Sequence, residues 1–394
     1  MRALSSWLLL LAFAAACGDR SATPSSSAAS SSAATTASSS ATGGPAPATS
    51  ASGSAPDATA VAEAPPKPDD PPRAIDMHVD TPWQVKYKDR PVSLPEGHAT
   101  MAKLKTGQYG GIVYPIYIPD YLHDSHPTIR DAEEIFDTVE SIISEHGDVL
   151  HAYTKGPTPP GKVTAYVSIE GAGCFADDIS QIDRFIKRGV IFIGPVHWHD
   201  SALSTSATGK DKKKRGLTEQ GKAFAERVYK NGGIVDVSHM SDRGFADLVP
   251  IAERYGAPIV ATHSNSRAVA DHPRNLTDEQ LRIIAKTGGV AGLNFYEKFV
   301  REGGGATVDD LAKHALHMIE VAGVDHVGIG SDFDGGTPAK GLEDASKVPA
   351  LAKALRKAGV SAEDVHKIFS ENVKRVIRSR EKQRAAASAG GSER

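Results

Sequence analysis

Residues 190–197 read VIFIGPVH and residues 110–118 read GGIVYPIYI, two runs that are apolar almost throughout. Such runs are typical of strands in a parallel sheet that is covered on both faces. Helical patterns separate them from six more β-rich runs, at residues 74–80, 163–170, 233–239, 258–263, 289–295 and 326–332. Eight strands that alternate with helices in about 300 residues predict an α/β fold, a (β/α)₈ barrel of the TIM type.

A doubly wound open sheet is the alternative arrangement. No G-x-G-x-x-G or Walker A motif follows any of the eight runs, which weakens the nucleotide-binding version of that fold. The helices carry clear end signals. Thr277 is a predicted N-cap with Gln280 completing a capping box, and Gly288 ends the same helix. Thr307 and Ser361 are the predicted N-caps of two later helices.

Composition excludes several classes of protein. Of the 394 residues, 40% are hydrophobic and 24% charged, and the shortage of apolar residues is concentrated between residues 18 and 72. The remaining chain is long enough to bury a large core without disulfides. A net charge of -3 does not indicate a nucleic-acid-binding surface, and two cysteines exclude a disulfide scaffold. No internal apolar run reaches 18 residues, so no internal membrane span is expected.

The first residues have the features of an export signal. A positive start, an apolar stretch and small residues before Cys17 resemble a bacterial lipoprotein signal, in which Cys17 would be lipidated; an ordinary signal peptide with a chance cysteine is the alternative. We therefore expect a lipid-anchored envelope protein, periplasmic or surface-facing. The expected parts are a signal (1–17), a disordered Ser/Ala/Pro-rich tether (18–72), a catalytic barrel domain (73–380) and a polar tail (381–394).

Six of the eight predicted strands end in residues that suit chemistry. Since all strands of such a barrel end at one rim, these residues should converge although they span about 250 positions. His78 and Asp80, two apart on a predicted strand, should point the same way. The strand-end residues are His78, Asp80, Glu170, His197, Asp236, His239, His263, Asp332 and Asp334.

Several imidazoles and carboxylates at one rim, with no cysteine among them, suit Zn²⁺ or a related divalent metal. They favour two metals that share a bridging carboxylate and hold a bridging hydroxide. Hydrolysis of an amide needs such a nucleophile, a polarised carbonyl and a proton donor for the leaving amine. Asp332 is placed for that proton transfer, and His197 is a candidate donor to the oxyanion of the tetrahedral intermediate.

Several motifs together resemble those of a known family. The segments are IDMHVDTPW at 75–83, SIEG at 168–171, DVSHMS at 236–241, ATHSNSR at 261–267, HPRN at 272–275 and GIGSDFDG at 328–335. In this order they resemble the membrane (renal) dipeptidases, the M19 metallopeptidases, and the resemblance extends over about residues 74–377. It implies a zinc-dependent dipeptidase on a metal-dependent hydrolase barrel, acting on dipeptides with a free C-terminal carboxylate, with a D-residue allowed there. It also implies a homodimer.

The resemblance further implies roles for individual residues. Two zinc ions would be held by His78 and Asp80 on one side and by His239 and His263 on the other, with Glu170 bridging both. The residues implied to act on the substrate are His197 at the scissile carbonyl oxygen, Arg274 at the terminal carboxylate, Tyr296 as its helper and Asp332 as the proton shuttle.

Two other hypotheses remain open. The same binuclear site would serve an N-acyl-amino acid deacylase or another amidohydrolase, and a non-catalytic, metal-containing envelope binding lipoprotein belongs to a different class. The residues after His197, Trp198-His199-Asp200-Ser201, depart from the family pattern, so side-chain specificity is open and Asp200 or His199 could alter the charge of the site. His314 and His317 are expected on a solvated helix face.

Overall fold

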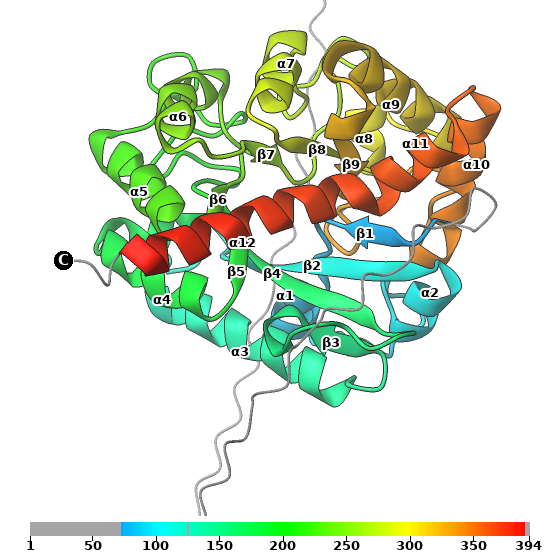
Figure 1. Ribbon diagram of the computed structural model, residues 1–394, viewed down its shortest axis with the longest axis horizontal. Helices are drawn as coiled ribbons and strands as arrows, with labels where there is room; N and C mark the ends of the chain where they lie inside the picture. The colour runs from blue at the N-terminus through cyan, green and yellow to red at the C-terminus, as the bar shows by residue number, and fades with distance from the viewer. Residues whose placement is uncertain (1–71, 124–125, 391–394) are drawn as a thin grey trace, which may run out of the picture. The chain divides into compact units, whose positions relative to one another are not determined.

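The computed structural model describes residues 72–123 and 126–390 (Figure 1). The predicted signal, Cys17 and all but the last residue of the predicted tether lie outside the described residues. None of the described helices is both long and apolar enough to cross a membrane.

Eight parallel strands form a nearly closed barrel, which confirms the (β/α)₈ prediction and rules out the open sheet. Their order is β6-β5-β4-β2-β1-β9-β8-β7, and a parallel bridge between Asp236 and Val260 links the two ends of that order. The short strand β3 (Leu150–Ala152) pairs with the outside of β4 and was not predicted. The barrel strands are β1 (Ala74–Asp76), β2 (Tyr109–Tyr117), β4 (Val163–Glu170), β5 (Val190–Gly194), β6 (Ile234–Val235), β7 (Val260–Ala261), β8 (Val290–Leu293) and β9 (Val327–Ile329).

Helices surround this barrel (Figure 1). The predicted capping box of Thr277 and Gln280 is formed, and Thr307 makes another with Asp310. Ser361 caps α11, and a π-helical turn (Lys367–Glu371) joins it to α12. The helices are α1 (Thr81–Lys88), α2 (Met101–Thr106), α3 (Ile129–Glu145), α4 (Ile182–Lys187), α5 (Glu219–Lys230), α6 (Asp242–Tyr255), α7 (Asp278–Lys286), α8 (Glu297–Val300), α9 (Val308–Ala322), α10 (Pro349–Lys357), α11 (Ala362–His366) and α12 (Asn372–Gly390).

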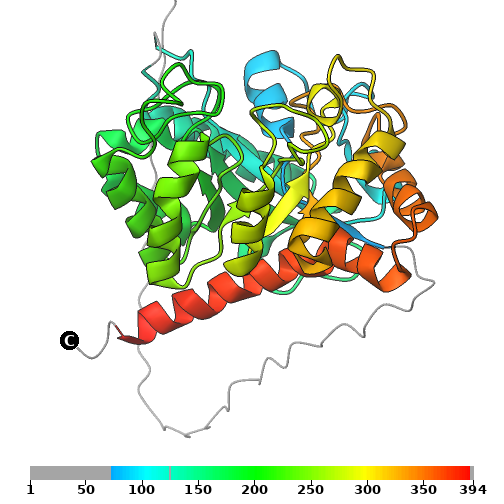
Figure 2. The same ribbon diagram turned by 90° about the horizontal axis from the view of Figure 1, so that it is seen from above.

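Helix α12 closes the amino-terminal end of the barrel. It lies across the strands in Figure 1 and along the side opposite the long loops in Figure 2. Its Val373, Val376 and Ile377 pack into the apolar cluster that fills the barrel interior. Arg380, itself buried, donates to the carbonyl oxygen of Val190 at 2.9 Å and so ties the helix to β5. The helix runs on to Gly390, past the predicted domain end at residue 380.

The chain approaches β7 so closely that several positions beside it accept only glycine, and Gly289 is one of them. A Cβ atom on Gly289 would lie 1.8 Å from the carbonyl oxygen of Ile259, a backbone atom that cannot move without shifting β7. The absence of a side chain at Gly289 is therefore a condition of barrel closure at this seam.

We expect Gly289→Ala to lower the free energy of unfolding by about 1–3 kcal/mol, because the added methyl group overpacks the seam. Gly147→Ala is the matched control, since its Cβ would find ordinary contacts no closer than 3.4 Å. Chemical denaturation of both variants measures the difference, and equal stabilities would show that the seam relaxes freely.

Candidate metal centre

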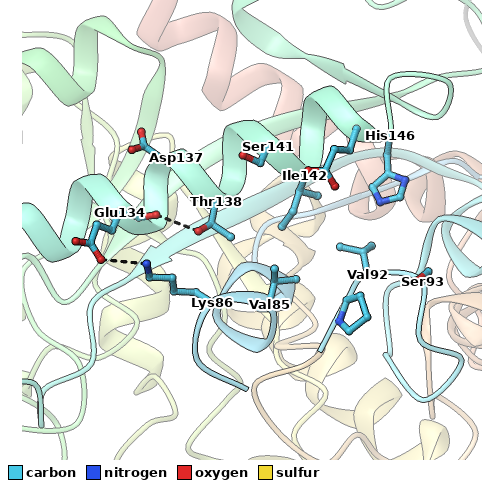
Figure 3. Close-up of a pocket in the computed structure, with 12 residues that line it drawn as sticks. Val85, Lys86, Val92, Ser93, Glu134, Asp137, Thr138, Ser141, Ile142 and His146 are labelled. Atoms are coloured by element: carbon cyan, nitrogen blue, oxygen red, sulfur yellow. Dashed lines mark hydrogen bonds and ion pairs between the residues drawn. The ribbon is translucent and has the colours of Figure 1, made fainter. Parts of the chain in front are cut away.

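A pocket of about 200 Å³ opens at the carboxyl-terminal rim of the barrel. Residues from seven of the eight strand ends line it: Asp80, Trp83, Tyr117, Glu170, His197, Trp198, His239, Tyr296, Phe299, Asp332 and Gly335. A second groove lies between α1 and α3 (Figure 3), where Lys86 Nζ pairs with Glu134 Oε2 at 3.0 Å. None of the predicted site residues lines that groove, so the chemistry belongs to the rim pocket.

Four of the five predicted ligands lie on turns just beyond the strands, and the fifth, Glu170, is the last residue of β4. Strand β1 ends at Asp76, so the prediction that His78 and Asp80 share a strand is wrong, and Asp80 is the N-cap residue of α1. The buried Asp76 carboxylate explains the early end. Its Oδ1 accepts from the N–H groups of His78, at 3.2 Å, and Ser331, at 2.8 Å, and holds two turns in place of sheet hydrogen bonds.

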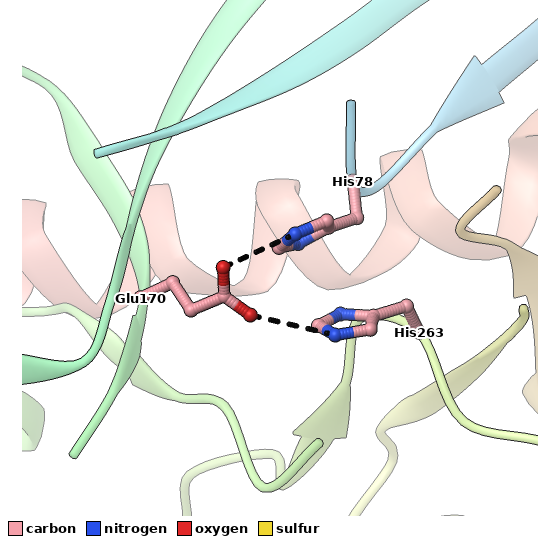
Figure 4. A group of neighbouring side chains, drawn as sticks. All are labelled: His78, Glu170 and His263. Carbon is pink, nitrogen blue, oxygen red and sulfur yellow. Dashed lines mark ion pairs between the residues drawn. The ribbon is translucent and has the colours of Figure 1, made fainter. Parts of the chain in front are cut away.

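The carboxylate of Glu170, at the end of β4, is the centre of the site. Its Oε1 lies 2.9 Å from His239 Nε2 and 3.5 Å from His263 Nε2, and its Oε2 lies 3.5 Å from His78 Nε2. Figure 4 shows the rings of His78 and His263 one above the other, each facing a different oxygen of this carboxylate. Asp80 Oδ2 adds a second oxygen 3.4 Å from His78 Nε2. All five predicted metal ligands are buried, and each lies within 3.5 Å of at least one of the others.

These residues fit divalent cations. Neither ring nitrogen of His78 has a hydrogen-bond partner among the described residues, although both are buried. His239 Nε2 and His263 Nε2 lie 2.9 Å apart, a separation at which at most one of the two nitrogens carries a proton. Nitrogen and oxygen donors that converge without enough protons between them are typical of a metal site. Three groups have donor atoms within 4.8 Å of one another: His78/Glu170/His263, Glu170/His197/His239 and His78/Asp80/Asp332.

One metal-ligand candidate is oriented by a visible relay. Thr262 Oγ1 donates its proton to Asp236 Oδ2 at 2.6 Å. Thr262 Oγ1 is therefore the acceptor in its contact with His263 Nδ1, at 2.8 Å. The ring proton of His263 therefore resides on Nδ1, and Nε2 presents its lone pair to Glu170 and the site. Partners of this kind fix the tautomer of a metal-binding histidine.

Burial and charge set the protonation of the cluster. Burial alone would raise the pKa of Glu170, but the charges of His78 and His197 hold it well below its usual value. Burial and the nearby Arg274 guanidinium hold the pKa of His239 well below its usual value, and burial together with His78 does the same for His263. Glu170 is therefore ionised while His239 and His263 are neutral, the states in which these groups bind metals.

His78 and Asp332 shift in the opposite direction. Burial would lower the pKa of His78, but the carboxylates of Asp80 and Glu170 raise it well above its usual value. Burial and the carboxylate of Asp80 raise the pKa of Asp332 well above its usual value. Asn294 Nδ2 donates to Asp332 Oδ2 at 3.0 Å and fixes the orientation of the carboxyl group.

The predicted substrate residues occupy the wall of the pocket and the layer behind it. His197, Tyr296 and Asp332 line the pocket directly. Arg274 lies behind the wall, with its NH2 3.1 Å from His239 Nε2 and its guanidinium 5.5 Å from the centre of the Phe299 ring. The guanidinium is buried, and no acidic side chain of the described residues forms an ion pair with it.

Sequence reasoning missed Asp120 and the aromatic walls of the pocket. Asp120 follows the second strand at the same rim and contacts His197, so a carboxylate just past a strand end was the available signal. The aromatic side chains that line the pocket but were not predicted are Trp83, Tyr117 and Phe299, whereas Trp198 lies on the loop after His197 that was expected to shape specificity. Aromatic residues are common in cores, and nothing in the spacing of the other three marked them.

Two expectations about polar side chains need correction. Asp200 accepts from the N–H groups of Ser206 and Asp211, each at 2.9 Å, and so stabilises its own loop. His314 is fully buried rather than solvated, because its two ring nitrogens bond the N–H of Ser266 and the carbonyl oxygen of Val300.

Known proteins resemble this chain over the whole barrel. The sequence profile of the membrane dipeptidases (peptidase family M19) matches residues 72–390. An uncharacterized dipeptidase of Schizosaccharomyces pombe is 30% identical over 337 residues, 77% of this chain and 79% of that protein. A dipeptidase of Claviceps purpurea is 29% identical over 312 residues, 75% of this chain and 72% of that protein.

Solved structures agree. The crystal structure of a metallopeptidase from Rhodobacter sphaeroides, liganded with a phosphinate mimic of the dipeptide L-Ala-D-Ala, is similar to this chain with a TM-score of 0.69 and 27% identity. The match covers 78% of this chain and 99% of that one.

We expect Thr262→Val to weaken metal binding by about 10- to 100-fold, because His263 Nδ1 loses the partner that fixes its tautomer. Competition with a chromophoric chelator measures the affinity. Thr205→Val is the control, since it removes an equally buried hydroxyl whose partners are Ser241 and the Arg215 carbonyl. Equal affinities in the two variants would contradict an orienting role for Thr262.

Proposed function

The chain belongs to the membrane dipeptidase family, peptidase family M19, and from this premise we propose that it is a two-zinc dipeptidase selective for a free C-terminal carboxylate. As a member of this family, the protein is a metal-dependent hydrolase of small peptides. The choice of zinc, the number of ions, the recognition of the carboxylate and the residue roles are the proposal. The observation that carries it is the buried Glu170 carboxylate among three imidazoles, beside the buried Arg274 guanidinium, which forms no ion pair with any described residue.

Zinc suits the donors present. His78, Asp80 and Glu170 would hold one ion, and Glu170, His239 and His263 the other, because imidazole nitrogens and carboxylate oxygens without a thiolate match a catalytic zinc site. When bound, the cations supply Lewis acidity at the scissile carbonyl and lower the pKa of water.

Arg274 supports the selectivity for a free carboxylate. A buried guanidinium without a counter-ion is costly, and burial lowers the pKa of Arg274 to about 10. A carboxylate of the substrate would supply the missing anion through a two-pronged hydrogen bond. Tyr296 lines the pocket and packs against Phe299 at 4.7 Å, so it forms part of the wall in front of Arg274.

Asp332 would transfer a proton, and His197 would stabilise the negative charge that develops on the carbonyl oxygen. A carboxyl group whose pKa is raised can hold a proton near neutral pH and deliver it to the leaving amine. His197 lines the same pocket, with its ring centre 4.5 Å from that of His239, where it would donate to the developing oxyanion.

A D-residue at the C-terminal end is part of the proposal. Its support is the similar Rhodobacter sphaeroides metallopeptidase, whose bound ligand mimics L-Ala-D-Ala. Lipid anchoring through Cys17 at a bacterial envelope, and a homodimer, also remain proposals. The first rests on the sequence pattern before Cys17 and the second on family resemblance.

The full chain should hydrolyse L-Ala-D-Ala when loaded with zinc and lose that activity when a chelator removes the metal. N-acetylated and C-terminally amidated copies of the dipeptide should be poor substrates, the latter because Arg274 would lack its anion. Chromatographic separation of the products measures all four arms, because cleavage of the Ala–Ala bond releases alanine whereas removal of the acetyl group releases acetate. Cleavage of the acetylated copies alone would instead indicate a deacylase, and metal binding without any hydrolysis would indicate a binding protein.

Asp332→Asn should lower kcat by about 10²- to 10⁴-fold through loss of proton transfer, yet stabilise the chelator-treated protein at neutral pH. Ionised Asp332 is unfavourable in the folded state because its pKa is raised there. The gain in Tm should therefore be absent below the pKa of Asp332 in the unfolded chain, about 3.8. It should grow as the pH rises through the higher pKa of Asp332 in the folded protein. Asp148→Asn, at an exposed position, should change neither quantity. A pH-independent Tm difference would refute this reasoning.

A further inference from the structure

A single carboxylate oxygen organises the loop that follows β5. Asp120 Oδ2 accepts from the backbone N–H groups of Trp198, at 3.0 Å, and His199, at 3.2 Å. The same oxygen lies 3.3 Å from Nδ1 of His197 and 3.2 Å from Nδ1 of His199. Asp120 lies beyond the end of β2, on a different part of the barrel from the loop it holds.

The contact with Asp120 fixes the orientation of the His197 ring. The ring is packed between those of Tyr117 and His239, and the centre of each of these two rings lies 4.5 Å from the centre of the His197 ring. Since Nδ1 faces Asp120, Nε2 is the nitrogen left for the pocket that His197 lines. A carboxylate that accepts from Nδ1–H holds an imidazole in one orientation and stabilises the positive charge that develops when Nε2 donates to an oxyanion.

We propose that Asp120 is a positioning residue for hydrolysis, which acts by aiming His197 Nε2 at the carbonyl oxygen of the scissile bond. The inference rests on the proposed function, because it takes His197 as the residue that meets this oxygen. Asp120 also fixes the Trp198 backbone, so one side chain places both the polar group at the reacting carbonyl and a neighbouring wall of the pocket.

A purely structural role for Asp120 makes a different prediction. If the side chain only held the loop, any acceptor for the two backbone N–H groups would suffice, and Asn would replace Asp fully. If it aims and charges His197, Asn would preserve the loop but not the charge-assisted contact. His199 offers the matched control: its imidazole contacts the same oxygen, but its side chain is 79% exposed and lies outside the pocket lining.

The test compares the zinc-loaded wild type with D120N, D120A and H199A. Each protein is assayed for kcat and KM on L-Ala-D-Ala, for metal content, and for the Kd of a phosphinate mimic of that dipeptide. The phosphinate resembles the tetrahedral intermediate, so its affinity reports on groups that act on the oxyanion. We expect D120N to lower kcat by about 10- to 100-fold and to weaken phosphinate binding in parallel, with KM and metal content close to wild type. H199A should resemble the wild type.

Wild-type kcat and phosphinate affinity in D120N would overturn the inference, even if D120A were impaired, because the role would then be to hold the loop. A change confined to KM would overturn it as well. Absence of dipeptide hydrolysis by the wild type would count against the proposed function instead. In that case the phosphinate affinities of wild type and D120N still decide whether Asp120 aims His197.

Discussion

The carboxylate of Glu170 among three imidazoles is the interaction on which the site depends. It is buried, so its charge must be balanced by groups that arrive from other strands. His78, His239 and His263 come from the ends of β1, β6 and β7, and only a closed ring of parallel strands places these ends around one point. Strand β4 positions Glu170 through a long register with β2, from Gly111/Thr164 to Tyr117/Glu170. The buried charge of Glu170 is therefore balanced only when the barrel is closed.

Much of this arrangement could be predicted from the sequence because a parallel barrel has a simple rule. Every strand ends at the same rim, so residues such as His78, Glu170, His263 and Asp332 could be assigned to one site without knowing the side-chain packing. The capping box at Thr277 was equally predictable, since its signal is local. What these predictions share is that position along an element determines position in space.

The remainder depended on contacts between distant parts of the chain. Arg274 is buried behind Phe299, and His314 bonds Ser266 and Val300, because loops from neighbouring strands fold over them. Strand β1 is shorter than predicted because the Asp76 carboxylate takes the place of the sheet partners. Asp120 lacked any motif of its own, and its importance follows from the residues that meet it in space.

Helix α12 has a consequence for the order in which the molecule is assembled. It follows all eight strands in the sequence, yet Val373, Val376 and Ile377 complete the apolar cluster inside the barrel. During synthesis β1 therefore leaves the ribosome about 300 residues before the helix that seals the base of the barrel. Contacts over such long separations form slowly, since a large loop must close first. The candidate metal ligands that follow β1 must accordingly wait for almost the entire barrel before they can meet the others.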